Sequence, residues 1–131
     1  MLVYADTSAL VKLVIAEAES AELEEWIRSA QVRFMTSSLT LTELPRAVMR
    51  TNPNVLGTAY EQLRMCGIVN LDPSLYAEAG RLEPHELRSL DAIHLAAALA
   101  LGSQLDGILT YDTRLAEAAR NVGIRPITID K

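Results

Sequence analysis

The sequence predicts a three-layer α/β/α domain, with helices on both faces of a parallel β-sheet, and three observations lead to this fold class. Short apolar stretches suited to strands alternate with longer stretches of helical periodicity along the whole chain. The strand candidates are apolar throughout, which is typical of parallel strands buried on both faces. The chain has 131 residues, half of them apolar, and can bury one sizeable core. We therefore expect a single domain over residues 1–131.

The first half of the chain is expected to pass twice from a strand into helices. The apolar run LVYA ends at Asp6, and helical spacing of apolar residues follows. Ser37 and Ser38 come after the second strand and suit the N-cap of the next helix. Pro45 lies inside that helix and should kink it, because proline removes a backbone hydrogen bond. The expected elements are strands 2–5 and 32–36 and helices 8–15, 19–30 and 39–50.

The second half repeats this alternation, with proline, polar and glycine residues at the ends of helices. Asn52 and Asp72 each stand directly before a proline, the arrangement of an N-cap followed by proline in the first helical turn. Ser89 suits the N-cap of a long alanine-rich helix that we expect to pack closely on the sheet, and Gly102 ends it. The expected elements are helices 53–65, 75–82, 90–101 and 113–121 and strands 67–71, 107–111 and 125–129.

Composition limits the classes of function. With 17 acids against 12 bases, the net charge of −5 argues against a protein that binds nucleic acid simply by being basic. It does not exclude a nuclease, because divalent cations bound to gathered acids would reverse the local charge. Cys66 is the single cysteine and is expected to be a buried free thiol, which fits a reducing compartment. No signal peptide or membrane-spanning apolar run is visible, so we expect a cytoplasmic protein without membrane association.

Four carboxylates are predicted to converge at one edge of the sheet. Asp6 follows the first strand and Asp112 follows the fourth, and ligands of parallel α/β sheets bind outside the carboxyl ends of strands. If these strands are neighbours, about 4.8 Å apart, the two carboxylates repel and need a cation or a shared proton. Glu43 and Asp91 lie early in helices that begin near the same edge. All four acids can therefore meet in one pocket.

Each acid also has an ordinary structural explanation. Asp6 and Asp112 precede helices and suit N-caps, and Asp91 in a first turn interacts favourably with the helix dipole. Glu43 can pair with Arg46 three residues later on a helix surface. The surroundings of Asp91, SLDAIHLAAALAL, favour a site, because a carboxylate in such an apolar helix is costly unless it is paired or binds a metal.

The ordered motifs ADTSALVKL, TLTEL, LDAIHLAAAL and ILTYDTRLAEAA resemble those of PIN-domain ribonucleases, specifically the VapC toxins of bacterial toxin–antitoxin pairs. The resemblance covers essentially the whole chain and implies a five-stranded parallel sheet in the order 3-2-1-4-5. It implies a metal-dependent endoribonuclease, a small VapB-type antitoxin that binds across the acidic edge, and a homodimer. It also implies that Mg²⁺ or Mn²⁺ is bound by Asp6, Glu43, Asp91 and Asp112.

Further residues near the acids have candidate roles. His94, three residues after Asp91, is either a general base or, as is more usual in an alanine-rich helix, a structural residue, and His85 is expected at the surface. Thr113 and Arg114 stand where some PIN nucleases carry a further acid, which leaves open whether one or two metal ions bind. The hydroxyls of Thr7, Ser8 and Thr110 either bond the carboxylates or serve only as strand-end and capping groups. The cations expected either at RNA phosphates or on a solvated face are Lys12, Arg46 and Arg50.

Two other classes of function remain open on the residues alone. Asp72 also follows a strand, so the chain can be a receiver-like phosphoacceptor domain, a class that needs a lysine near the acids and would have to use Lys131. The chain can also be a non-catalytic interaction module whose acids are only helix caps. Substitution of Asp6 or of Asp72 would separate these classes.

Overall fold

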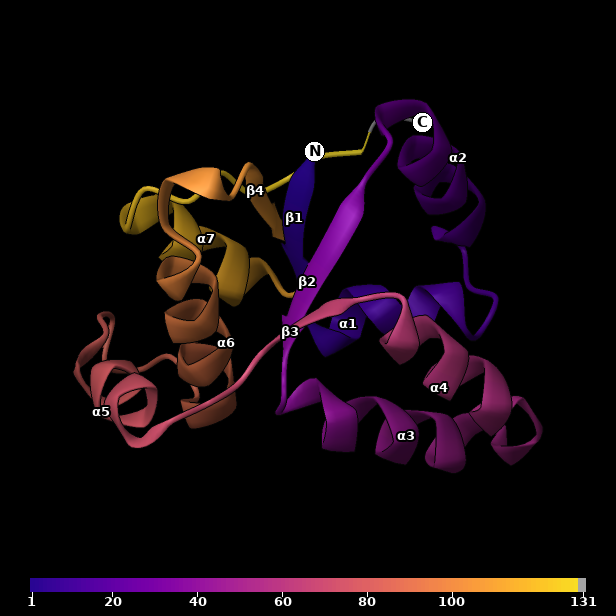
Figure 1. Cartoon of the computed structure of the whole chain (residues 1–131), viewed down its shortest axis with the longest axis horizontal. Coiled ribbons are helices and arrows are strands. Elements are labelled where there is room, and N and C mark those ends of the chain that lie inside the picture. Colours follow the sequence, from indigo (N-terminus) through magenta and orange to yellow (C-terminus); the bar gives the residue numbers. More distant parts are fainter. Residues whose placement is uncertain (130–131) are drawn as a thin grey trace.

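The computed structural model describes residues 1–129, in which helices flank a four-stranded sheet on both faces (Figure 1). All neighbouring strands are parallel, and their order is β3-β2-β1-β4. The predicted adjacency of the first and fourth strands is therefore confirmed. The strands are β1 (Leu2–Ala5), β2 (Arg33–Ser37), β3 (Gly67–Val69) and β4 (Gly107–Leu109).

The helices largely follow the predicted pattern, but two of them contain 3-10 turns. The predicted helix 8–15 is one α-helical turn followed by a 3-10 turn, and the predicted helix 53–65 begins as a 3-10 turn. The α-helices are α1 (Thr7–Leu10), α2 (Ser20–Ala30), α3 (Thr40–Thr51), α4 (Leu56–Arg64), α5 (Pro73–Arg81), α6 (Ser89–Ala100) and α7 (Thr113–Asn121), and the 3-10 turns are η1 (Val11–Leu13), η2 (Pro53–Val55) and η3 (Gly102–Gln104). None of these helices, in the part of the chain that is described, is long and apolar enough to cross a membrane.

None of the three serines predicted as caps is one, whereas the caps at Asn52 and Asp72 are confirmed. Ser37 is the last residue of β2, and its buried hydroxyl has no hydrogen-bond partner among the described residues. Ser38 precedes the N-cap of α3, and its hydroxyl accepts a hydrogen bond from the backbone N–H of Leu71 instead. Ser89 is already the first residue of α6, after an N-cap that makes no side-chain hydrogen bond. Asp72 caps α5 as predicted, and α3 continues through Pro45 without ending.

The predicted fifth strand, residues 125–129, is also corrected by the structure. This segment lies against β4 but forms a single parallel bridge, between Pro126 and Ile108. Ile108 donates its N–H to the carbonyl of Arg125 and accepts a hydrogen bond from the N–H of Ile127. The described sheet therefore has four strands rather than the five expected.

Toward the start of β4 this pairing does not lengthen, because the next donor of the ladder is engaged elsewhere. Backbone groups on one side of a strand recur every second residue, so Asp106 would continue the pairing of Ile108. The N–H of Asp106 donates to the carbonyl of Leu2 in β1 instead.

The two helical layers pack on opposite faces of the sheet because successive residues of a strand point to opposite sides. Val3 and Ala5 of β1 belong to the apolar cluster formed with α1, α2, α3 and α4. Tyr4, between them, belongs to the cluster formed with α6 and α7. In Figure 1, α1 to α4 accordingly lie on one side of the strands and α5 to α7 on the other.

The alanine-rich sequence of α6 lets this helix approach the sheet closely, as predicted. Ala92 and the run Ala96–Ala98 are buried, and α5 packs on the outer side of α6 through Ala79. Because α1, α3 and α7 directly follow β1, β2 and β4, their first turns lie at the carboxyl edge of the sheet (Figure 1). Several first turns, and the polar side chains that they carry, are thereby placed at one edge.

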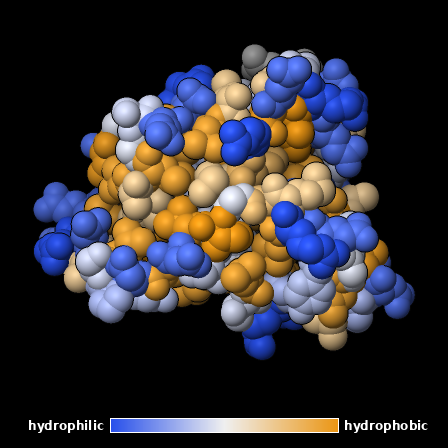
Figure 2. All heavy atoms as spheres, viewed as in Figure 1, coloured by the Kyte–Doolittle hydropathy of each residue, from blue (hydrophilic) through white to orange (hydrophobic). Residues whose placement is uncertain are grey.

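Not all apolar side chains are covered in the single chain. Figure 2 shows apolar residues gathered over the middle of this face, between the two groups of helices, with hydrophilic residues mainly around the periphery. Met49 of α3 and Tyr60 of α4 are about half exposed, and Met65, after α4, is 76% exposed.

Cys66 is only partly buried, so the prediction of a buried thiol holds in part. Burial still raises the pKa of this thiol, to about 11.

Candidate functional site

Asp6 lies directly after β1 and is both a helix cap and a buried acid. Its Oδ1 accepts hydrogen bonds from the Ser8 hydroxyl at 2.7 Å and from the Ala9 N–H at 3.2 Å, while Thr110 donates to Oδ2 at 2.6 Å. The residue is only 4% exposed. Burial raises the pKa of Asp6, and the hydrogen bonds from Thr110 and Ser8 offset this only in part. Two of the three predicted hydroxyls thus contact this carboxylate.

Glu43 is held at the start of α3 by two donors on the same oxygen. Its Oε1 accepts from the Thr7 hydroxyl at 2.6 Å, and lies 2.7 Å from Nε2 of His94. Burial works to raise the pKa of Glu43, but the hydrogen bonds from His94 and Thr7 outweigh it and leave the pKa below its ordinary value. The alternative pair with Arg46 is not formed among residues 1–129.

His94 links Glu43 to the interior of the sheet, a contact that the sequence did not indicate. Its Nδ1 lies 2.7 Å from the hydroxyl of Tyr4, and the two rings meet edge to face with centroids 5.8 Å apart. Both side chains are buried. Burial raises the pKa of Tyr4, so the phenol keeps its proton. The available signal was the i, i+3 spacing of Asp91 and His94 on α6, which placed His94 on the side of the acids.

Asp112 and Asp91 complete the acidic edge. Asp112 caps α7, with Oδ1 accepting from the N–H groups of Arg114 and Leu115 at 2.9 and 3.3 Å. Asp91 lies in the first turn of α6, and nothing in residues 1–129 donates a hydrogen bond to its carboxylate. Burial raises the pKa of Asp91, and the charge of Asp112 raises it further, with smaller contributions from Asp6 and Glu43 against an opposing one from His94. The charges of the other three acids thus act on Asp91, and a shared site for the four carboxylates stays a prediction.

These carboxylates suit a hard divalent cation by chemistry. Carboxylate oxygens are the ligands that Mg²⁺ and Mn²⁺ prefer. Within residues 1–129, neither lysine nor arginine forms an ion pair with any of the four acids. In that same range no three His, Cys, Asp or Glu side chains are close enough together to hold a metal ion as they stand. The donor set fits, and a bound cation would have to draw the acids closer together.

Lys12, one of the three predicted phosphate contacts, is engaged elsewhere. It is 9% exposed, and its ammonium lies 2.6 Å from Glu19 and 3.0 Å from Glu17. The ammonium also lies 4.6 Å from the ring centroid of Tyr111, in reach of a cation–π interaction. Arg46 and Arg50 are exposed on α3 and stay candidates for phosphate contacts.

Asp72, the acid that a receiver-like domain would use, serves as a helix cap. Asp72 is exposed and accepts hydrogen bonds from Ser74 and Leu75 as the cap of α5, and these bonds lower its pKa. Lys131, which a receiver-like domain would use, lies outside the described residues. His85 is exposed, as expected.

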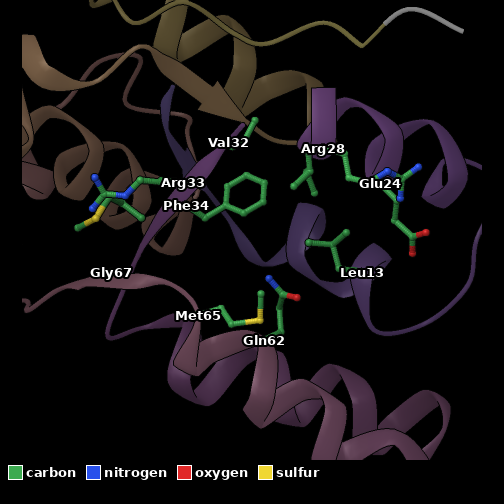
Figure 3. A pocket seen from close by; sticks show the side chains of 11 residues that line it. Leu13, Glu24, Arg28, Val32, Arg33, Phe34, Gln62, Met65 and Gly67 are labelled. Carbon is green, nitrogen blue, oxygen red and sulfur yellow. The ribbon is translucent and has the colours of Figure 1, made fainter. Parts of the chain in front are cut away.

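The pocket drawn in Figure 3 is separate from the acidic edge. It has a volume of about 410 Å³ and lies between α2, β2 and α4. Apolar side chains such as Leu13 and Phe34 line it together with Glu24, Arg28 and Arg33, and none of the four acids takes part. This pocket is therefore not the place where the carboxylates meet.

Comparison with known proteins assigns the chain to a family. Residues 3–121 match the PIN domain family. Ribonuclease VapC46 of Mycobacterium tuberculosis is 37% identical over 125 residues, which cover 95% of each chain. Two solved structures share the fold at lower identity. The Sarcin-Ricin loop cleaving toxin VapC20 of M. tuberculosis has a TM-score of 0.73 and 18% identity, covering 93% of this chain and 95% of the other. A toxin–antitoxin complex from Klebsiella pneumoniae has a TM-score of 0.71 and 20% identity, covering 96% of both chains. This chain therefore belongs to the PIN-domain family, in the branch that its VapC ribonuclease relative represents.

Proposed function

We propose that this chain is a Mg²⁺- or Mn²⁺-dependent endoribonuclease that acts as the toxin of a VapBC-type toxin–antitoxin pair. The single observation that supports the proposal is that Asp91 feels the charges of Asp112, Asp6 and Glu43, three acids that lie beside the carboxyl ends of strands or in the first turn of a helix. The relationship to VapC ribonucleases supports RNA as the substrate. On this proposal the whole chain, residues 1–131, forms one PIN domain.

The residues of the site have distinct roles in this proposal. When bound, a divalent cation supplies charge that acidifies water and stabilises the oxygens of a phosphodiester. Asp6, Asp91 and Asp112 would hold the cation directly or through water, and Glu43 would be a ligand or would orient the attacking water. The hydroxyls of Thr7, Ser8 and Thr110 fix the orientation of Asp6 and Glu43 before any cation binds. No covalent enzyme intermediate is required.

The ordinary cap explanation does not account for the whole arrangement. A cap needs a side chain that accepts from the first turn, and Asp6 and Asp112 both do so. Asp91 and Glu43 cap nothing, yet they bring two more charges to the same edge. The pKa values of Asp6 and Asp91 are raised, so these two carboxylates oppose folding when they are ionised, as acids at functional sites often do.

Cleavage of RNA by the purified chain tests this proposal. We expect cleavage with Mg²⁺ or Mn²⁺, complete loss with a chelator, and a loss of more than about 100-fold in the Asp6→Asn variant. Asparagine caps helices as well as aspartate does, so the variant should keep the fold. Asp72→Asn is the matched control and should cleave normally. Robust cleavage by Asp6→Asn would refute the metal site, and damage by Asp72→Asn would favour the receiver-like alternative.

The proposal includes partners and a cellular location. We propose that a VapB-type antitoxin binds across the acidic edge and inhibits the enzyme, that the chain forms a homodimer, and that it works in the cytoplasm. The similarity to a chain of a toxin–antitoxin complex supports the choice of an antitoxin. Mapping the RNA fragments that appear in cells after induction, with and without the antitoxin, would identify the substrate and test the inhibition.

A further inference from the structure

We propose that His94 is a positioning residue that holds Glu43 through its Nε2–H, and that Tyr4 in turn holds His94. This inference rests on the proposed function for the role of Glu43, but the hydrogen-bond chain itself stands on geometry. The links are short, 2.7 Å between the Tyr4 hydroxyl and Nδ1 and 2.7 Å between Nε2 and Oε1 of Glu43.

The direction of the contact with Glu43 follows from the groups available. The carboxylate of Glu43 can only accept, so Nε2 of His94 carries the proton that lies between them. The other ring nitrogen, Nδ1, faces the hydroxyl of Tyr4, which can either donate or accept. The chain of hydrogen bonds therefore joins Tyr4 to His94, and His94 donates to Glu43.

Burial makes this chain rigid. Tyr4 is 0% exposed and packs with residues of α6 and α7, and His94, on α6, is 2% exposed. Tyr4 is fixed by the backbone of β1, which pairs on both sides with β2 and β4. The position of Glu43 at the start of α3 is thus tied to the centre of the sheet rather than to a surface loop.

The two hydrogen bonds to Glu43 fall on the same carboxylate oxygen. Oε1 of Glu43 accepts from both His94 and Thr7, whereas no group in residues 1–129 donates to Oε2. Two donors from different elements fix the plane of the carboxylate. Oε2 is then the oxygen presented to a cation or to a water molecule.

The first test examines His94 in the metal-free protein. Nitrogen NMR of the imidazole should show Nε2 protonated, with a proton resonance that moves when Glu43 is replaced in Glu43→Gln. The control variant His85→Gln, which changes the exposed histidine, should leave this resonance in place. An Nε2 without a proton, or a proton resonance whose chemical shift is unchanged in Glu43→Gln, would overturn the proposed contact.

The second test measures Mn²⁺ affinity by electron paramagnetic resonance. Residues that orient a metal ligand typically account for about 10- to 100-fold in metal affinity, and we expect a loss of this size in His94→Ala. His94→Gln keeps a donor for Glu43 and should recover part of the loss, which a purely structural role would not predict. His85→Gln should bind Mn²⁺ like the unmodified chain.

Epistasis separates failure of this inference from failure of the proposed function. Because His94 acts through Glu43, Glu43→Gln combined with His94→Ala should bind Mn²⁺ no more weakly than Glu43→Gln alone. If Glu43→Gln weakens Mn²⁺ binding and His94→Ala does not, the positioning role is wrong and the metal site stands. If neither Asp6→Asn nor Glu43→Gln changes Mn²⁺ binding, the metal site is wrong, and the NMR result alone decides the hydrogen-bond chain.

Discussion

Nε2 of His94 and Oε1 of Glu43 lie 2.7 Å apart, although α6 and α3 cover opposite faces of the sheet. The contact therefore joins the two helical layers around the carboxyl edge, beside Asp6 and Asp91. Because His94 belongs to the opposite layer, its contact holds the carboxylate of Glu43 from outside helix α3. Substitutions at this edge and in the helical layers around it should affect RNA cleavage, RNA affinity and the free energy of unfolding separately.

Asp91→Asn should lower RNA cleavage by more than about 100-fold and at the same time stabilise the metal-free protein. Burial and the charge of Asp112 raise the pKa of Asp91, so the folded state favours the protonated form. A carboxyl group with a raised pKa loses stability as pH rises from its unfolded value, about 3.9, through its folded value. The substitution removes this loss, and we expect a gain of about 0.5 kcal/mol at neutral pH, the scale of partly exposed charge interactions.

The measurement is thermal unfolding of both proteins in chelator across acid to neutral pH. The difference in melting temperature should widen as pH rises and then level off, and Mg²⁺ should reduce it by stabilising only the unmodified protein. A melting temperature lower in Asp91→Asn at every pH would mean that Asp91 stabilises the fold.

Replacing Arg46 and Arg50 together by alanine should weaken RNA binding without disturbing the fold. Both residues are exposed on α3, one and two turns after Glu43, and neither forms an ion pair within residues 1–129. Affinity for a labelled single-stranded RNA is measured at several salt concentrations in the Asp6→Asn background. The salt slope should fall by about 0.7 for each phosphate that these arginines neutralise in the unmodified chain. Arg120→Ala, at an exposed arginine paired with Glu117, is the control, and equal slopes in both variants would contradict the prediction.

Lys12→Met should destabilise the protein by about 1–2 kcal/mol, because it leaves two partly exposed glutamates without their cation. Burial works to lower the pKa of Lys12, but the hydrogen bonds to Glu19 and Glu17 outweigh it and raise the pKa. The ion pairs therefore stabilise the fold fully below the unfolded lysine pKa, about 10.4, and are lost as pH rises through the raised value.

Urea unfolding at neutral pH measures the effect of Lys12→Met. The control is Arg28→Met, at an arginine that pairs with Glu25 on the surface of α2, with both side chains 68% exposed. That change should stay within about 0.5 kcal/mol. Equal losses in the two variants would show that burial of Lys12 adds nothing.

Gly107→Ala should destabilise the contact between β4 and the segment that follows α7. A Cβ at this position would lie 2.6 Å from Cδ1 of Ile127 and 2.7 Å from the carbonyl oxygen of Arg125. The backbone oxygen cannot move without breaking the bridge to Ile108, so we expect a loss of about 1–3 kcal/mol in unfolding free energy. Gly57→Ala is the matched control, since nothing lies within 4 Å of its Cβ, and it should gain up to about 1 kcal/mol.

Much of the fold could be predicted because its signals are local. Strand-forming apolar runs, Asp72 before a proline and the glycine after α6 placed most elements within a few residues. The extent of the fifth strand could not be predicted, because the described segment pairs with β4 only at the bridge between Pro126 and Ile108, and the N–H of Asp106 is engaged by β1. Such pairing is a matter of tertiary contact. Ser38 shows the same limit, since its hydroxyl serves the backbone of Leu71 from another part of the chain.

Residue types and their order along the chain were enough to predict a four-acid site, since carboxylates after parallel strands and in the first turns beside them can face the same edge. Sequence spacing alone could not find the partners of those acids. The Tyr4, His94 and Glu43 chain joins residues up to 90 positions apart, and Lys12 turned toward Glu17 and Glu19 instead of toward a substrate. The direction of a side chain depends on what is buried against it, and that is settled only when the two helical layers close on the sheet.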